Sequence, residues 1–557
     1  MKRVQKVLAI VGFMAVVILA IWSTQPFAET KAQSDANNSP IEVWIDPAVP
    51  IEFPIMLAPL FSSGKYLWAN TPDNARLEVS INAEGGAISS DWVYVPVVPF
   101  ASTAETITYA DIEHFWTTGD AAPLAYISSD RVTAPRLVVT GAVYDALRTA
   151  WGEPNSAATI ELVTGDTPEI SGKLWEERPN AWSIVPFHLL SPDLKVLKLD
   201  GVNIFADDFQ LTSYPLKVRV ALTGHEAAVG QAIDDLMAAQ TWQPTNRDIT
   251  KMTRIVLTGV TAMSRATAYK METLGVTKPG ELILPFVQDA NILHTSNEVA
   301  FSENCPTPDP YIDSTVFCAA DKYMELLTYI GLDVVELTGN HVNDYGVGAL
   351  RHSLDLYDAN GIAHFGGGRN FEDARLPYLV ENNGNTIAFI GCNVPGPFKS
   401  WATTEDPGSS QCDEAYLAEE LPKLAAENDI VIMSVQQWEF YRYEAGLEQI
   451  GQFTNFANLG ADVVIGTQAH QPQGFTFVTR PGQPPSFLHH GLGNLFFDQM
   501  QSIGTRQMFM DKLIIYDGRL ISVDLFTGML EDYCCPRPMT ADERVDFLTT
   551  IFAASGW

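Results

Sequence analysis

The segment Val334-Val335-Glu336-Leu337-Thr338-Gly339-Asn340-His341-Val342-Asn343-Asp344-Tyr345-Gly346 decides the fold that we expect for the second half of the chain. Its first residues predict a buried strand, which delivers Asn340 and His341 to a tight turn. Active sites of α/β folds lie at the carboxyl ends of strands, so this turn is a candidate site. Amide oxygen and imidazole ligands suit Mn, Mg, Fe or Zn, and Asp344 is placed to hold the histidine by a hydrogen bond.

The surrounding sequence, from about residue 250 to the end, repeats one unit: an apolar strand followed by a polar or glycine-rich loop. This alternation predicts an α/β domain over 250–557. The loops contain most of the polar residues that are able to bind a ligand or take part in catalysis. Four further blocks stand out in chain order: Thr258-Gly259-Val260-Thr261-Ala262-Met263-Ser264-Arg265, Ser296-Asn297-Glu298, Gly460-Ala461-Asp462-Val463-Val464-Ile465-Gly466-Thr467-Gln468-Ala469-His470 and Gly491-Leu492-Gly493-Asn494-Leu495-Phe496-Phe497-Asp498-Gln499.

Together the five blocks resemble, in the same order, the signature of the CapA family of bacterial capsule and poly-γ-glutamate synthesis proteins. The resemblance spans about 254 to 500. Calcineurin-like phosphoesterases also place an Asn and a His side by side after a strand. The resemblance therefore implies a metallophosphoesterase-like α/β sandwich for 250–557, in which the Asn oxygen binds a metal and the His contacts the transferring group.

The resemblance also implies a site. Glu298, Asn340, His341 and His470 would converge on one polar pocket that holds one divalent ion. His341 and His470 are the candidate general acid and base, because the pKa of histidine lies near working pH, and Asp344 supports them. The candidate substrate-binding residues are Arg265, Asn297, Trp438, Glu439 and Asn494.

The chain departs from the family pattern at three ligand positions. Val260 stands where the family has a metal-binding Asp, the block Gln436-Gln437-Trp438-Glu439 has glutamine where a histidine is expected, and Gln468 replaces another histidine. A glutamine oxygen is a poorer metal ligand than imidazole or carboxylate, so we do not expect a two-ion clamp. Two interpretations stay open: a site for a metal or an anionic ligand, or a degenerate, hydrogen-bonded polar core.

The first half alternates short strands and helices, which predicts a second α/β domain over 41–242. Within it, Ala181–Phe187, Leu199–Asn203 and Tyr214–Leu216 resemble the second lobe of type 2 periplasmic solute-binding proteins of the phosphate-binding kind. Gln243-Pro244-Thr245-Asn246-Arg247 reads as the linker between the two domains.

The N-terminus predicts export. Lys2, Arg3 and Lys6 precede an apolar run from Val7 to Trp22. This arrangement is typical of a signal peptide, here over 1–32 with a polar linker at 33–40, or of an uncleaved membrane anchor. Either alternative predicts an extracytoplasmic protein, secreted or anchored to the outer face of the cytoplasmic membrane.

Six cysteines in an exported chain predict disulfide bonds. The short-range pairs Cys305 with Cys318 and Cys392 with Cys412 are expected to form. The adjacent Cys534 and Cys535 are not expected to bond with each other.

The net charge of -33, from 67 acidic and 34 basic residues, excludes nucleic acid as a partner. The partners we expect are an anionic envelope polymer or a small anion. Three functions stay open: biosynthesis or export of a capsule polymer, metal-dependent hydrolysis of phosphoester or envelope amide bonds, and binding of an anion or polymer without catalysis.

Overall fold

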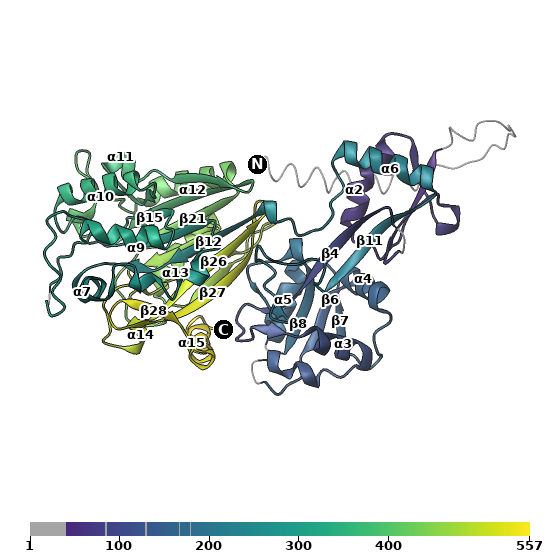
Figure 1. Cartoon of the computed structure of the whole chain (residues 1–557), viewed down its shortest axis with the longest axis horizontal. Coiled ribbons are helices and arrows are strands. Elements are labelled where there is room, and N and C mark those ends of the chain that lie inside the picture. The colour runs from purple at the N-terminus through teal and green to yellow at the C-terminus, as the bar shows by residue number, and fades with distance from the viewer. Residues whose placement is uncertain (1–39, 84–85, 129–130, 166, 179, 313) are drawn as a thin grey trace. The chain divides into compact units, whose positions relative to one another are not determined.

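The computed structural model describes residues 40–557 except 84–85, 129–130, 166, 179 and 313 (Figure 1). The predicted signal segment at 1–32 and nearly all of the linker at 33–40 lie outside the described residues. Within the described part of the chain, no helix has the length and apolarity needed to cross a membrane.

The chain forms two compact units, one of residues 40–90 with 219–244 and one of residues 91–218 with 245–557. The chain passes from the first unit to the second between residues 244 and 245, inside the predicted linker at 243–247. The units do not otherwise follow the predicted ranges 41–242 and 250–557, and the assignment of these two ranges as domains stays a prediction.

The first unit is a small α/β arrangement. Strand β1 runs parallel to both β2 and β3, and β11 pairs antiparallel with β3. Helices α2 and α6 pack against each other. The bounds are β1 Ile41–Ile45, α2 Glu52–Ser62, β2 Tyr66–Trp68, β3 Leu77–Ile81, β11 Lys217–Gly224 and α6 Glu226–Ala239.

Residues 91–218 of the second unit add strands and helices in alternation. The strands lie in the order β4, β8, β6, β7, with β9 paired to β4. The bounds are β4 Ile88–Pro99, α3 Tyr109–Thr118, β6 Arg136–Thr140, α4 Gly141–Trp151, β7 Ile160–Val163, α5 Thr167–Glu177, β8 Ala181–Pro186 and β9 Leu194–Val196. The mixed α/β class predicted for the first half is confirmed.

The C-terminal part of the second unit contains two larger sheets. The first has the order β16, β15, β14, β12, β26, β27, β28, with β13 paired to β14 and β25 paired to β13. Its strands β12, β14, β15 and β16 are parallel, and the remaining pairs along this order are antiparallel. The bounds are β12 Met252–Thr258, β13 Val260–Thr261, β14 Ile292–Asn297, β15 Val334–Glu336, β16 Ala363–Phe365, β25 Asn494–Phe496, β26 Gln507–Tyr516, β27 Arg519–Glu531 and β28 Cys535–Pro538.

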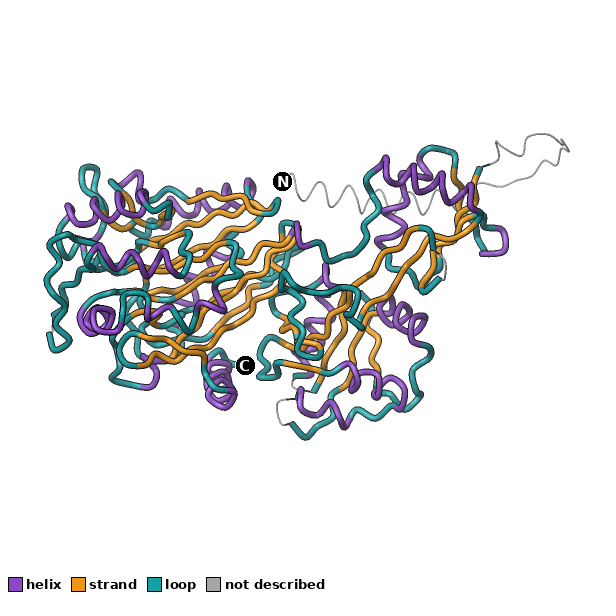
Figure 2. The backbone as a smooth tube through the Cα atoms, viewed as in Figure 1, coloured by secondary structure: helices purple, strands orange, loops and turns teal. Residues whose placement is uncertain are grey.

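The second sheet has the order β18, β19, β21, β22, β24, β23, and its four inner strands are parallel. Helices connect and cover the two sheets, and Figure 2 shows strands bordered by helices in this part of the chain. The bounds are β18 Tyr378–Asn382, β19 Asn385–Asn393, β21 Ile430–Gln436, β22 Val463–Thr467, β23 Phe475–Val478 and β24 Ser486–His489 for the strands, and α7 Arg265–Leu274, α9 Met324–Tyr329, α10 Val347–Ala359, α12 Glu414–Glu427, α13 Leu447–Leu459 and α15 Ala541–Ala554 for the helices.

Side-chain alternation along the strands separates the apolar core into layers. Ile255 of β12 and Ile432 of β21 belong to one apolar cluster that draws on both sheets. Val256, next to Ile255, faces the cluster made with α9 and α10, whereas Met433, next to Ile432, faces the cluster made with α12 and α13. Because neighbouring residues of a strand point to opposite faces, this pattern gives helices, sheet, sheet and helices in four layers. The predicted α/β sandwich is confirmed.

Two disulfide bonds were expected and are present. The structure joins Cys305 with Cys318 and Cys392 with Cys412. Each bond closes a loop that leaves a strand of one of the two sheets, because Cys305 follows β14 and Cys392 lies in β19.

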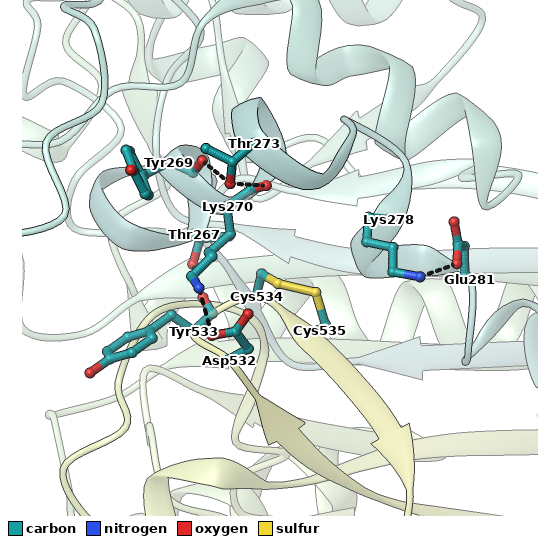
Figure 3. The surroundings of a disulfide bond; sticks show 10 residues. All are labelled: Thr267, Tyr269, Lys270, Thr273, Lys278, Glu281, Asp532, Tyr533, Cys534 and Cys535. Carbon is teal, nitrogen blue, oxygen red and sulfur yellow. Dashed lines mark hydrogen bonds and ion pairs between the residues drawn. A yellow bond between two sulfur atoms is a disulfide. The ribbon is translucent and has the colours of Figure 1, made fainter.

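The expectation for the adjacent pair was wrong, because Cys534 and Cys535 are bonded to each other (Figure 3). The other four cysteines are already paired, so each of these two has only its neighbour as a partner. They follow a turn in which Asp532 and Tyr533 both have positive φ. Thr267 of α7 donates a hydrogen bond to the Tyr533 carbonyl and holds this turn in place.

Removal of the long-loop disulfide is expected to destabilise the second unit. Replacing Cys392 and Cys412 together by alanine should lower the free energy of unfolding by about 3 kcal/mol, because the bond closes a loop with a sequence separation of 20. Denaturant unfolding measures this loss. The matched control replaces Cys534 and Cys535 by alanine, which opens no long loop; an equal loss in both variants would contradict the chain-entropy explanation.

Candidate functional site

The site is built around a buried carboxylate. Glu298 follows the last residue of β14, and its backbone N–H donates to the Thr261 carbonyl at 3.0 Å. The residue is 2% exposed, and neither carboxylate oxygen has a hydrogen-bond partner among the described residues. A buried carboxylate without a hydrogen bond is costly, so a nearby positive charge must compensate for it.

The group that compensates for this charge is His341, which lies on the turn after β15. A Cβ atom at Gly339 would lie 2.8 Å from the Cα atom of Glu298, so only glycine allows the turn to come this close. His341 forms an isolated parallel bridge with Val299, next to Glu298. The glycine and this bridge therefore place the Asn340–His341 pair directly against the end of β14.

His341 lies between two carboxylates. Its Nδ1 donates to Asp344 Oδ2 at 2.6 Å, and its Nε2 lies 3.7 Å from Glu298 Oε1. Asp344 is held in turn by the Phe317 backbone N–H at 3.0 Å and by the Lys399 ammonium at 2.7 Å. Asp344 thus forms with His341 the hydrogen bond that the sequence predicts.

This placement shifts the titration of both groups. Burial alone would lower the pKa of His341, but the hydrogen bond to Asp344 and the charges of Glu298 and Asp344 outweigh burial and raise it. Burial would raise the pKa of Asp344, but hydrogen bonds from His341 and Lys399 outweigh it and lower the pKa. The pair is thus stabilised as imidazolium and carboxylate.

A group of amide side chains forms the adjoining part of the site. Gln436, the last residue of β21, donates from Nε2 to Asn340 Oδ1 at 3.1 Å and to Gln468 Oε1 at 2.7 Å. Thr467 donates to Gln436 Oε1 at 3.2 Å. The loops after β15, β21 and β22 therefore meet, as their positions at the carboxyl ends of strands predict.

His470 is held from its Nδ1 side. That atom lies 2.7 Å from Asn494 Oδ1, and Asn494 Nδ2 donates to the His470 carbonyl at 3.2 Å. The imidazole stacks on Phe497 with ring centroids 5.1 Å apart, and its Nε2 lies 3.9 Å from Glu439 Oε1. Asn494 is therefore a positioning residue for His470.

Tyr441 stacks beside His470, with ring centroids 6.2 Å apart. Its hydroxyl donates to Glu439 and accepts from Gln499 Nε2. Burial, the hydrogen bond to Glu439 and the charge of that carboxylate raise the pKa of Tyr441, and the Glu298 charge adds to this shift. Tyr441 therefore lies within electrostatic reach of both carboxylates.

The remaining predicted residues have different surroundings. Arg265 pairs with Asp498, with Nη2 to Oδ1 at 2.5 Å, and its guanidinium lies over the ring of Phe497. Asn297 is fully buried and donates to the Tyr357 hydroxyl of α10 at 2.6 Å, so it offers no surface to a substrate and instead ties β14 to α10. Trp438 is 55% exposed beside Glu439.

Two residues of the site lie outside the set of site residues that the sequence predicts. Lys399 lies on the loop after β19, far from every block used to predict the site, and no local pattern marks it. Tyr441 lies three residues after Trp438, and its spacing does not distinguish it from an aromatic side chain that packs in the core.

Among the described residues, the predicted ligands Glu298, His341 and His470 do not bring three ligand atoms within 4.8 Å of one another. Within the described ranges, only Glu303, Asp321 and His352 form a group of three His, Cys, Asp or Glu side chains with ligand atoms all within 4.8 Å of one another, and none of them is a predicted ligand. The Asn340 oxygen is already taken by the Gln436 amide. We therefore derive no chemical step through a metal, and the predicted ion stays a prediction.

The candidate site lies within a part of the chain that is similar to known proteins. Residues 254–499 match the family model described as bacterial capsule synthesis protein PGA_cap. The chain is 25% identical over 185 residues to the capsule biosynthesis protein CapA of Bacillus anthracis, an alignment that covers 32% of this chain and 44% of that protein. It is 24% identical over 179 residues to the PGA biosynthesis protein CapA of Bacillus subtilis, with 32% and 45% covered. The chain thus spans less than half the length of these relatives.

Two solved structures also have some similarity to this chain. The 5'-nucleotidase precursor from Thermus thermophilus has a TM-score of 0.32 and 14% identity, covering 54% of this chain and 59% of that one. An ABC-type phosphate transport receptor from Vibrio cholerae has a TM-score of 0.30 and 9% identity, covering 36% and 96%.

The raised pKa of His341 is expected to depend on Asp344. Because the folded-state pKa of His341 is raised, the protonated imidazole stabilises the fold. This contribution to the free energy of unfolding is complete below the unfolded-state pKa near 6.5 and is lost as pH rises through the higher folded-state pKa. Hydrogen–deuterium exchange at the imidazole, followed by mass spectrometry, should give a midpoint above 6.5 in the wild type and a lower one in Asp344→Asn. An unchanged midpoint in this variant would contradict the assigned role of the carboxylate.

Proposed function

We propose that this chain, whose residues 254–499 match the bacterial capsule synthesis family model, acts in the biosynthesis or export of an anionic capsule polymer of the poly-γ-glutamate type. The names of the two relatives support the polymer class. The observation that supports a chemical role is the charged row Glu298, His341 and Asp344, which lies inside the matched region.

The row is suited to acid–base chemistry on an amide bond of such a polymer. The raised pKa of His341 favours its protonated form, and its Nε2 lies on the side of Glu298, whose two carboxylate oxygens accept no hydrogen bond from the described residues. Glu298 takes a proton from an attacking water, the new C–O bond forms at the carbonyl carbon, and His341 gives its proton to the leaving nitrogen as the C–N bond breaks. The products are a carboxylic acid and an amine.

An anionic chain needs local positive charge, because the protein as a whole is strongly acidic. Lys399 supplies it: its side chain is 57% exposed, and Asp344 fixes its ammonium beside His341. Lys399 is therefore the residue that we assign to binding a polymer carboxylate.

Three disulfide bonds support an oxidising location. We accordingly place the protein outside the cytoplasm, in agreement with the export signal predicted at 1–32.

The decisive experiment compares two histidine variants on a γ-linked oligoglutamate. His341→Gln should reduce the rate of amide cleavage by at least about 100-fold, because it removes the proton donor. The matched control is His352→Gln, since His352 pairs with Asp321 and not with any residue of the site. Chromatography of the products follows the reaction, and equal rates in wild type and His341→Gln would refute a catalytic role for the histidine.

A second candidate is binding of the polymer without cleavage. The specific observation that favours it is the amide group around Gln436, which is satisfied by hydrogen bonds without a metal. Under this alternative, oligoglutamate raises the melting temperature of the wild type without turnover, and Lys399→Ala abolishes the rise. Cleavage that depends on His341 would exclude it.

A further inference from the structure

The side chain of Gln436 occupies the space between two amide oxygens that would otherwise be free to bind a cation. Its Nε2 lies 3.1 Å from Asn340 Oδ1 and 2.7 Å from Gln468 Oε1. An NH₂ group has two hydrogens, and here each one meets one oxygen. The two acceptors are thus satisfied by a single neutral donor.

The orientation of this amide is fixed from the other side. Gln436 of β21 is the register partner of Thr467 of β22, and the Thr467 hydroxyl donates to Gln436 Oε1 at 3.2 Å. Rotating this amide alone would place its oxygen against the oxygens of Asn340 and Gln468. With the Asn340 and Gln468 oxygens facing Gln436, this is the orientation that satisfies both of them.

Burial makes the arrangement hard to exchange for an ion. Gln436 is 1% exposed and Gln468 is 4% exposed, and Gln468 adopts a positive φ of 73°. An ion shared by the two oxygens would have to displace the NH₂ group, which would then be buried without an acceptor. Such a buried, unsatisfied donor loses its hydrogen bonds to water without replacement.

We propose that the Gln436 amide takes the place of a metal ion as the bridge between the loops after β15 and β22. Gln436 is then a positioning residue: by holding Asn340 it holds the adjacent His341 against Glu298. Gln436 and Gln468 act as one unit, because one donates to the other. Gln436 would do this whatever molecule the site acts on.

The test converts the donor into an acceptor of the same shape. Gln436→Glu places carboxylate oxygens near the oxygens of Asn340 and Gln468, a set of oxygen ligands that suits a divalent cation. In EDTA its melting temperature should fall by at least about 2 °C, and Mn²⁺ should restore it. The matched control is Gln437→Glu, because the neighbouring amide bonds to Gln452 instead; this variant should show no Mn²⁺-dependent recovery.

A second measurement does not depend on the folding of that variant. Mn²⁺ is titrated calorimetrically into the wild type and into Asn340→Ala. No binding in the wild type, or binding that is equal in both proteins, supports the proposal, because in both cases the Asn340 oxygen does not bind Mn²⁺. Mn²⁺ binding that is lost in Asn340→Ala would overturn it, as would a Gln436→Glu variant that folds but gains no stability from Mn²⁺ beyond the Gln437→Glu control.

Discussion

The burial of the Glu298 carboxylate opposite the His341 imidazole is the constraint on which the rest of the site depends. A carboxylate that is removed from water and receives no hydrogen bond needs a cation nearby. His341 supplies it, Asp344 stabilises the imidazolium, and Lys399 balances Asp344 at the exposed end. Charge thus alternates from the interior to solvent along these four side chains.

The four-layer arrangement explains how these groups meet. Parallel strands of both sheets end with polar residues, and the loops after β14 and β15 supply the charged row, whereas β21 and β22 supply the amide group. Gly339 allows the closest approach between two of these loops. Asn340 belongs to the amide group and His341 to the charged row, so one turn couples the two parts of the site.

Much of this arrangement could be predicted, because strand periodicity and the position of polar residues after strands are local properties of the sequence. The α/β class and the candidate turn at Asn340 and His341 follow from them, whereas the sandwich and the convergence with Glu298 were implied by the family resemblance. Asn297 was assigned to the substrate although alternation along β14 sends it to the face opposite Glu298, where Tyr357 binds it. Lys399 could not be predicted, since its position depends on the path of a long loop. The bond between Cys534 and Cys535 depends on a turn with two positive φ angles that no sequence pattern marks.

The most direct test of the account is the coupling energy between Glu298 and His341, measured by denaturant unfolding of Glu298→Gln, His341→Gln and the double variant at neutral pH. If the buried carboxylate is compensated by the imidazolium, the two losses are strongly non-additive, with a coupling of at least about 1 kcal/mol. If the losses add to within about 0.3 kcal/mol, the two groups do not interact, and the charged row described here does not exist.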